Sequence, residues 1–159
     1  MFNAKPIPSH KSDSYKALID DLKYLIVKND TRITKYSNLS ALLNYYMTDI
    51  NWVGFYLYDD EKLNLGPFQG LPACTTIFLG SGVCGTAAST QKTVMVDDVQ
   101  SFDGHIACDM NSASEIVVPI VKDGSLIGVL DIDSPIKSRF DEVDKRFLEE
   151  IIDKLVDIL

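Results

Sequence analysis

The sequence lacks a long hydrophobic run, and it has few basic residues. Its 159 residues carry 15 Lys and Arg against 23 Asp and Glu, which gives a formal net charge of −8. Nucleic acids and anionic membranes are bound mainly through Lys and Arg, so this balance argues against both as partners. No stretch approaches the roughly 20 apolar residues of a membrane helix. The beginning of the chain also lacks the apolar segment of a signal peptide, so we expect a cytoplasmic protein.

Cysteine is scarce too, with three in the chain: Cys74, Cys84 and Cys108. In the cytoplasm they should rest as thiols, and any disulfide should be transient and catalytic. Each lies in a segment that contains Gly or Pro, not in an apolar strand, so we expect each to be accessible. Together with His105 they could instead bind zinc, although they lack the C-x-x-C pair that most structural zinc sites use.

Internal repeats, linkers and low-complexity tracts are also absent, so we expect one domain over residues 1–159, with 1–11 as a flexible N-terminal arm. Helical spacing of apolar residues predicts helices within 12–28, 36–49 and 140–159, the last with Asp141 as N-cap. Residues 82–90 could form a short helix. Strands are expected at 51–58, 63–68, 75–79, 93–96, 115–121 and 125–133. This order indicates an α+β domain, an antiparallel sheet with helices, including the N- and C-terminal ones, on one face and a loop-covered pocket on the other.

Three acidic residues stand in the last two predicted strands: Glu115, Asp131 and Asp133. A three-residue loop at 122–124 pairs Glu115 with Asp131 and gathers all three acids on one face. A two-residue loop would pair Glu115 with Ile132 and separate them. We favour the first register. Crowded buried carboxylates are costly unless they bind a cation or stay protonated, so the cluster predicts a functional site.

Two further patterns need an interpretation. Trp52 and Tyr56 share one face of a predicted strand, as core side chains or as a wall of the pocket. Residues 80–85 read G-x-G-x-x-G, which occurs in dinucleotide-binding folds. The segment that follows is too short for a crossover helix, and the glycines are better explained by tight turns around Cys84.

Seven sequence blocks carry a resemblance to a known family. They are N-W-V-G-F-Y at 51–56, L-G-P-F-Q-G at 65–70, P-A-C at 72–74, G-V-C-G-T-A-A at 82–88, G-H-I-A-C-D at 104–109, S-E-I-V-V-P-I at 114–120 and G-V-L-D-I-D-S-P at 128–135. In this order they resemble the free methionine-(R)-sulfoxide reductases, which are stand-alone GAF-domain enzymes. The resemblance implies a six-stranded antiparallel sheet with a pocket roofed by loops.

The resemblance also implies roles for individual residues. Cys108 corresponds to the nucleophile, and Cys74 and Cys84 correspond to the cysteines that can resolve it. Between these two we favour Cys74 as the resolving cysteine, because the Pro and Gly residues around it suggest a mobile loop, with Cys84 as a second resolving cysteine or a relay. The remaining candidates are the catalytic acids Glu115 and Asp133 and the substrate-binding residues Trp52, Tyr56, Asp109 and Asp131. No bound cofactor or metal is implied.

The activity implied is antioxidant repair of free methionine. Free L-methionine-(R)-sulfoxide would be reduced through a Cys108 sulfenic acid and an intramolecular disulfide. Thioredoxin, supplied with electrons from NADPH by thioredoxin reductase, would restore the thiols. A homodimer is compatible with this domain type. The competing interpretation is a GAF module that binds a small molecule without chemistry, which explains neither the cysteines nor the acids.

Overall fold

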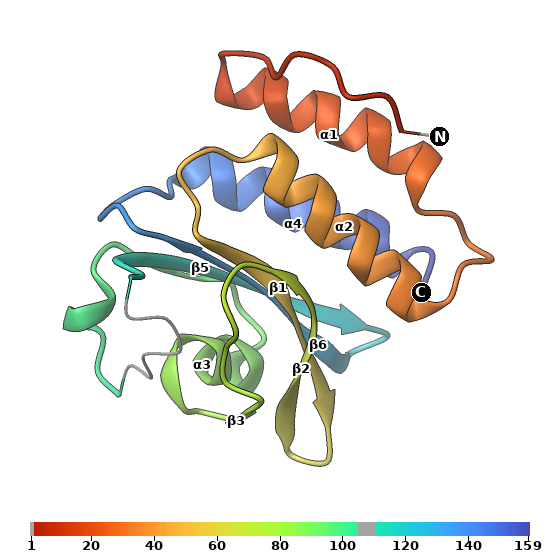
Figure 1. Cartoon of the computed structure of the whole chain (residues 1–159). Helices are drawn as coiled ribbons and strands as arrows, with labels where there is room; N and C mark the ends of the chain where they lie inside the picture. The colour runs from red at the N-terminus through yellow and green to blue at the C-terminus, as the bar shows by residue number, and fades with distance from the viewer. Residues whose placement is uncertain (1, 105–110) are drawn as a thin grey trace.

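The computed structural model describes residues 2–104 and 111–159 of the chain. Within these residues six antiparallel strands form one sheet in the order β3-β2-β1-β6-β5-β4 (Figure 1). The elements are α1 (Lys11–Leu25), α2 (Arg32–Tyr46), β1 (Trp52–Asp59), β2 (Lys62–Gln69), β3 (Thr76–Phe78), α3 (Gly82–Thr90), β4 (Val94–Val96), a 3-10 turn (Val99–Ser101), β5 (Ser114–Lys122), β6 (Ser125–Ser134) and α4 (Glu142–Val156). The predicted fold class is confirmed.

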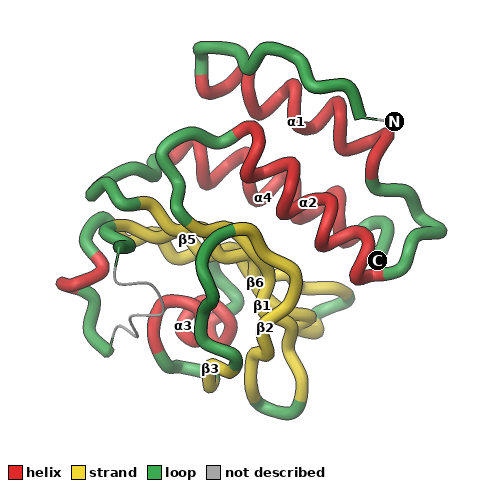
Figure 2. The backbone as a smooth tube through the Cα atoms, in the orientation of Figure 1, coloured by secondary structure: helices red, strands yellow, loops and turns green. Residues whose placement is uncertain are grey.

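The two faces of the sheet are covered differently. Helices α2 and α4 lie on one face with α1 outside them, while α3 and its flanking loops lie on the other (Figures 1 and 2). Successive side chains of a strand point to opposite faces, so each strand supplies both layers. The layer under α2 and α4 includes Val53, Phe55, Ile116, Leu130 and Ile132. The layer under α3 includes Trp52, Tyr56, Val117 and Val129.

Helix α4 begins where the sequence predicts its start. The Asp141 side chain accepts hydrogen bonds from the backbone N–H groups of Val143 and Asp144, at 2.8 and 3.1 Å. The Asp144 carboxylate accepts in return from the backbone N–H of Asp141, which completes a capping box. The N-cap prediction is therefore confirmed. None of the helices in the described residues is both long enough and apolar enough to cross a membrane.

The hairpin between β5 and β6 differs from the predicted one. Its loop has two residues, 123–124, both with positive φ, and Lys122 pairs with Ser125. One pair farther from the loop, Val121 pairs with Leu126. The register then shifts at a β-bulge, so that Ile120 pairs with Gly128. The bulge places one extra residue in β6. The predicted three-residue loop is wrong, because a left-handed pair of turn residues closes the hairpin more tightly.

The bulge has a direct consequence for the acidic residues. Glu115 pairs with Asp133, and Val117 pairs with Asp131, so the predicted pairing of Glu115 with Asp131 is wrong. A two-residue loop without a bulge would have sent the acids to opposite faces. The extra residue in β6 shifts the pairing by one further position. Glu115, Asp131 and Asp133 therefore lie on the same face of the sheet.

Candidate active site

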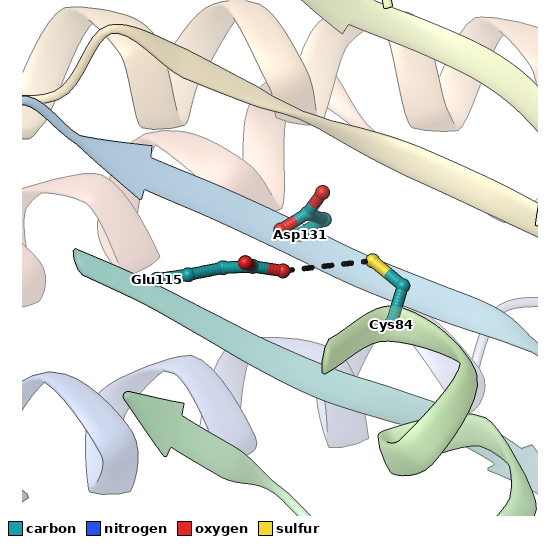
Figure 3. A group of neighbouring side chains, drawn as sticks. All are labelled: Cys84, Glu115 and Asp131. Atoms are coloured by element: carbon teal, nitrogen blue, oxygen red, sulfur yellow. Dashed lines mark hydrogen bonds between the residues drawn. The ribbon is translucent and has the colours of Figure 1, made fainter. Parts of the chain in front are cut away.

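A thiol and two carboxyl groups meet on the sheet face under α3. Cys84 comes from α3, Glu115 from β5 and Asp131 from β6, and their side chains point toward one another (Figure 3). The Cys84 sulfur and one carboxyl oxygen of each acid lie within 4.8 Å of one another. The Cys84 Sγ–H donates a weak hydrogen bond to Glu115 Oε1 over 3.9 Å. All three residues are at most 6% exposed, so the group is shielded from bulk water.

Two glycines allow the elements around this cluster to approach. Gly54 of β1 pairs with Asp131, and a Cβ built on it would lie 2.3 Å from the Cβ of Phe68. Gly85 follows Cys84, and a Cβ there would lie 2.3 Å from the carbonyl oxygen of Phe78. Any side chain at either position would push neighbouring atoms apart. The glycines thus bring α3 and the aromatic side chains close to the acids.

Burial dominates the electrostatics of the cluster. It raises the pKa of Glu115 well above the ordinary value, and the neighbouring charge of Asp131 raises that pKa further. Burial also raises the pKa of Asp131 to about 6. The Asp131 Oδ1 atom has no hydrogen-bond partner among the described residues. Of the two acids, Glu115 is therefore the one that burial and its neighbour favour in the protonated form.

The same burial acts on the thiol of Cys84. It raises the pKa of that thiol well above the ordinary value, and the adjacent Asp131 and Glu115 add to the effect. A thiolate is the reactive form of cysteine, so Cys84 is held in its unreactive state at neutral pH. The expectation that Cys84 is accessible is wrong, because α3 packs its inner side against the sheet and leaves Cys84 only 4% exposed. A thiol and two carboxylates are donors that Zn²⁺ accepts, so this group could also hold a metal ion if Cys84 lost its proton.

Three stacked aromatic rings form a wall beside the acids. The Trp52 ring lies between those of Tyr56 and Phe68, with centroid distances of 5.8 and 5.3 Å. Trp52 Nε1 donates a hydrogen bond to the carbonyl oxygen of Leu71 at 3.0 Å, and Tyr56 Oη donates one to that of Cys74 at 3.1 Å. The wall therefore fastens the loop that carries Cys74. Burial and the charge of Asp131 raise the pKa of Tyr56, which keeps its hydroxyl a donor.

Known proteins are similar to this chain in both sequence and fold. The model of the GAF domain family matches residues 39–159. A protein of Escherichia coli (strain K12) named free methionine-R-sulfoxide reductase is 45% identical over 150 residues, which cover 94% of this chain and 91% of that protein. The chain belongs to the free methionine-R-sulfoxide reductase family.

Two solved structures extend this membership to three dimensions. The structure of fRMsr of Staphylococcus aureus in complex with substrate is 50% identical, covers 99% of both chains and gives a TM-score of 0.87. The X-ray structure of free methionine-R-sulfoxide reductase from Neisseria meningitidis, also in complex with its substrate, is 39% identical. It covers 99% of this chain and 95% of that chain, with a TM-score of 0.94.

The site residues proposed for this member of the family divide into three groups. The first comprises side chains that meet at the cluster or its wall: Cys84, Glu115, Asp131, Trp52 and Tyr56. The second comprises neighbours. Asp133 is half-buried and pairs with Glu115, and Cys74 is half-buried and disulfide-bonded, whereas Cys84 is a free thiol. The third group, His105, Cys108 and Asp109, lies outside the described residues. The alternative zinc site includes His105 and Cys108, so two of its four ligands lie there too.

Reasoning from the sequence missed two members of this site. Phe68 extends the aromatic stack, and Gly54 makes room for it. A signal for Phe68 was present, because β2 follows β1 in a hairpin and an aromatic residue near its end can reach the opposite strand. Gly54 has no comparable signal, since its role depends on which side chains pack over it.

Proposed function

We propose that this protein reduces free L-methionine-(R)-sulfoxide to L-methionine, with Cys108 as the nucleophile. The observation that carries the proposal is a buried carboxylic acid whose pKa is raised beside an aromatic wall, in a chain closely related to free methionine-R-sulfoxide reductases. A sulfoxide oxygen is a poor leaving group without a proton. An acid that stays protonated near neutral pH meets this need.

The chemical step transfers one oxygen atom. The Cys108 thiolate attacks the sulfoxide sulfur while an acid donates a proton to the oxygen. The sulfur–oxygen bond of the substrate and the newly formed sulfur–sulfur bond then break as the protonated oxygen passes to Cys108 Sγ. Methionine leaves, and Cys108 becomes a sulfenic acid. The substrate sulfur gains two electrons, and the Cys108 sulfur loses two.

Glu115 is the proton donor that the electrostatics favour. Its pKa is raised well above the ordinary value, whereas that of Asp131 rises only to about 6. A proton shared by the pair therefore resides mainly on Glu115, and the ionised Asp131 keeps it there. Asp133, which pairs with Glu115 across the two strands, is the second candidate for contact with the sulfoxide oxygen.

The remaining site residues bind the substrate in this proposal. The methyl and thioether parts of the substrate would lie against Trp52 and Tyr56, since sulfur and methyl groups pack well on aromatic rings. Asp131 presents a buried oxygen without a partner among the described residues, which could accept from a donor of the substrate. Asp109 joins them on the strength of the family resemblance.

Cys74 resolves the sulfenic acid. Its thiol would attack Cys108, release water and form a disulfide. Cys74 is disulfide-bonded, while Cys84 is a free and buried thiol, and these two facts favour Cys74 over Cys84. The raised pKa of Cys84 likewise disfavours it as an attacking group. Thioredoxin, recharged by NADPH and thioredoxin reductase, would then return both cysteines to thiols.

The test follows NADPH oxidation with thioredoxin and thioredoxin reductase, using the R and S forms of free methionine sulfoxide separately. We expect turnover on the R form alone, lost in Cys108→Ser and retained in Cys84→Ala. Turnover that survives Cys108→Ser would eliminate it as the nucleophile. If dithiothreitol also fails to support turnover of the wild type, the chain binds a small molecule without chemistry.

Two variants separate the steps. Cys74→Ser should release one methionine per chain in a rapid burst and then stop, since the sulfenic acid forms but no disulfide follows. Glu115→Gln should slow the burst itself by a factor of about 10²–10⁴, the usual contribution of general acid catalysis. A burst of normal rate in Glu115→Gln would assign the proton donor elsewhere.

A further inference from the structure

The stretch of chain around Cys74 contains no ionisable side chain apart from Cys74 and Cys84 themselves. Residues 63–91 contain no Asp, Glu, Lys, Arg or His, although Asp, Glu, Lys and Arg make up 24% of the chain. This stretch includes the loop that carries Cys74, the strand β3 and the helix α3. Strand β3 is one of the two edge strands of the sheet, so its outer edge is not paired with another described strand (Figure 1). Charged residues are usual on the surface of a domain, so an uncharged run of this length with exposed residues in it requires an explanation. Lys62, which pairs with Phe78, borders the run.

Two large apolar side chains are exposed on either side of Cys74. Leu71 is 57% exposed and Phe78 is 65% exposed, while Cys74 between them is half-buried. The polar neighbours Thr75 and Thr76 are exposed as well. Exposed apolar side chains close to one another in the chain, with few charges around them, are typical of protein–protein contacts.

The backbone of this segment is held in place. Trp52 Nε1 binds the carbonyl oxygen of Leu71, and Tyr56 Oη binds that of Cys74. Strand β3 is paired with β2 through Ile77 and its two neighbours, and Ile77 is 4% exposed. A surface that is already ordered in its binding conformation loses little conformational entropy when a partner docks.

We propose that Leu71, Cys74 and Phe78 form the docking surface for a protein dithiol of the thioredoxin type, which reduces the disulfide at Cys74. The proposal rests on the catalytic cycle proposed above, and it adds to that cycle the place where the reductant binds. We call this surface the reductant face.

The dimensions of the reductant face suit such a partner. An extended chain advances at most about 3.6 Å per residue, so Leu71 lies within about 11 Å and Phe78 within about 14 Å of Cys74. A small transient interface that buries about 600 Å² on each side has a radius of about 14 Å. One partner centred on Cys74 can therefore cover both apolar side chains.

The chemistry also favours a protein over a small anionic thiol. A charged tripeptide thiol would need cationic side chains to hold its carboxylates. Residues 63–91 contain none, and Lys62, the ladder partner of Phe78, is a single cation at the end of the face that is farther from Leu71 in the sequence. A protein with an apolar rim around its reactive cysteine instead gains by burying Leu71 and Phe78. The chain has a net charge of −8, which would repel an acidic partner. Residues 63–91 contain no acidic side chain, so this repulsion is weaker here.

The reaction at this surface is an exchange of two electrons. A thiolate of the partner attacks Cys74 Sγ, the disulfide breaks, and the other cysteine of that disulfide leaves as a thiolate. The second thiol of the partner then attacks the mixed disulfide. Cys74 leaves as a thiolate, and the partner departs with a disulfide of its own.

The test compares two reductants on the same variants. Leu71→Glu and Phe78→Glu each place a charge on the reductant face, and Ile33→Glu places one on α2, where Ile33 is 66% exposed. With thioredoxin, thioredoxin reductase and methionine-(R)-sulfoxide, we expect the KM for thioredoxin to rise about tenfold in each of the first two variants and to stay within twofold in Ile33→Glu. Turnover driven by dithiothreitol should stay within twofold of the wild type in all three, because that reductant needs no docking surface.

Other outcomes lead to distinct conclusions. Equal losses with thioredoxin and dithiothreitol in Leu71→Glu and Phe78→Glu, repeated in the milder Leu71→Ser and Phe78→Ser, would overturn the proposal by showing a structural role. An unchanged KM for thioredoxin in both glutamate variants would also overturn it, and so would a wild type that turns over with dithiothreitol but not with thioredoxin. Failure of the wild type with both reductants would refute the catalytic cycle itself.

Discussion

Asp131→Asn should make the protein more stable relative to the wild type as the pH rises. Loss of a carboxylate with a lowered pKa would have the opposite effect. Asp131 is 6% exposed, and its Oδ1 atom has no hydrogen-bond partner among the described residues. Burial raises its pKa to about 6 from an ordinary value of 3.8. The folded state therefore prefers the neutral acid, and asparagine has nearly the same shape without the charge.

The sign and size follow from proton linkage. A carboxyl whose pKa is higher in the folded state stabilises the fold at pH values below 3.8, and this contribution is lost as the pH rises through about 6. One pKa unit corresponds to about 1.4 kcal/mol, so the full loss is about 3 kcal/mol, of which about 2 kcal/mol falls between pH 4 and pH 8. Asparagine cannot ionise, so the variant should gain about 2 kcal/mol relative to the wild type over that interval.

Urea denaturation at several pH values between 4 and 8 measures this difference, and thermal unfolding should show a relative gain of about 4–8 °C for a chain of this size. The comparison between pH values cancels any constant packing cost of the substitution. Asp153→Asn, at an exposed position of α4, is the matched control and should follow the wild-type curve. If the curves of Asp131→Asn and the wild type run parallel, Asp131 is not a buried acid with a raised pKa.

Three further substitutions test the packing around the site. Gly54→Ala should destabilise the fold by about 1–3 kcal/mol in urea, because its Cβ would lie 2.3 Å from the Phe68 Cβ; an unchanged midpoint would contradict that close contact. Asp141→Ala should cost about 1 kcal/mol through loss of the capping box, with no effect on the methionine burst. Tyr56→Phe should slow closure of the disulfide about 5–10-fold in stopped-flow thiol assays, because it frees the Cys74 carbonyl, and an unchanged closure rate would mean that the loop needs no such anchor.

The order of elements could be predicted from the sequence, but one local register could not. Within the described residues, apolar patterns place the six strands and three of the four helices close to their observed ranges, and the Ala-, Gly- and Thr-rich composition of 82–90 indicates the fourth. The register of the β5–β6 hairpin depends on a bulge next to Ile120, and the residues there are ordinary strand formers that carry no sign of it. The acids were expected on one face, and they are there, although Glu115 faces Asp133 and not Asp131 across the ladder.

The environment of each site residue was harder to predict than its identity. Glu115 and Asp131 could be selected from the sequence, because acids in apolar strands are unusual. The burial of Cys84 could not, since the small residues that surround it suit both a flexible loop and a closely packed helix. Only the packing of α3 against the sheet decides between these, and it makes Cys84 an unreactive neighbour of the acids.

The loop before β3 is anchored to the aromatic wall through its backbone. Trp52 and Tyr56 bind the carbonyl oxygens of Leu71 and Cys74, atoms that every amino acid provides. Substitutions in this loop can therefore change its chemistry without removing these two hydrogen bonds. The loop is thus a suitable place to exchange one reductant specificity for another, or to install a selenocysteine or a chemical probe at Cys74, while the acids and the aromatic wall keep their arrangement.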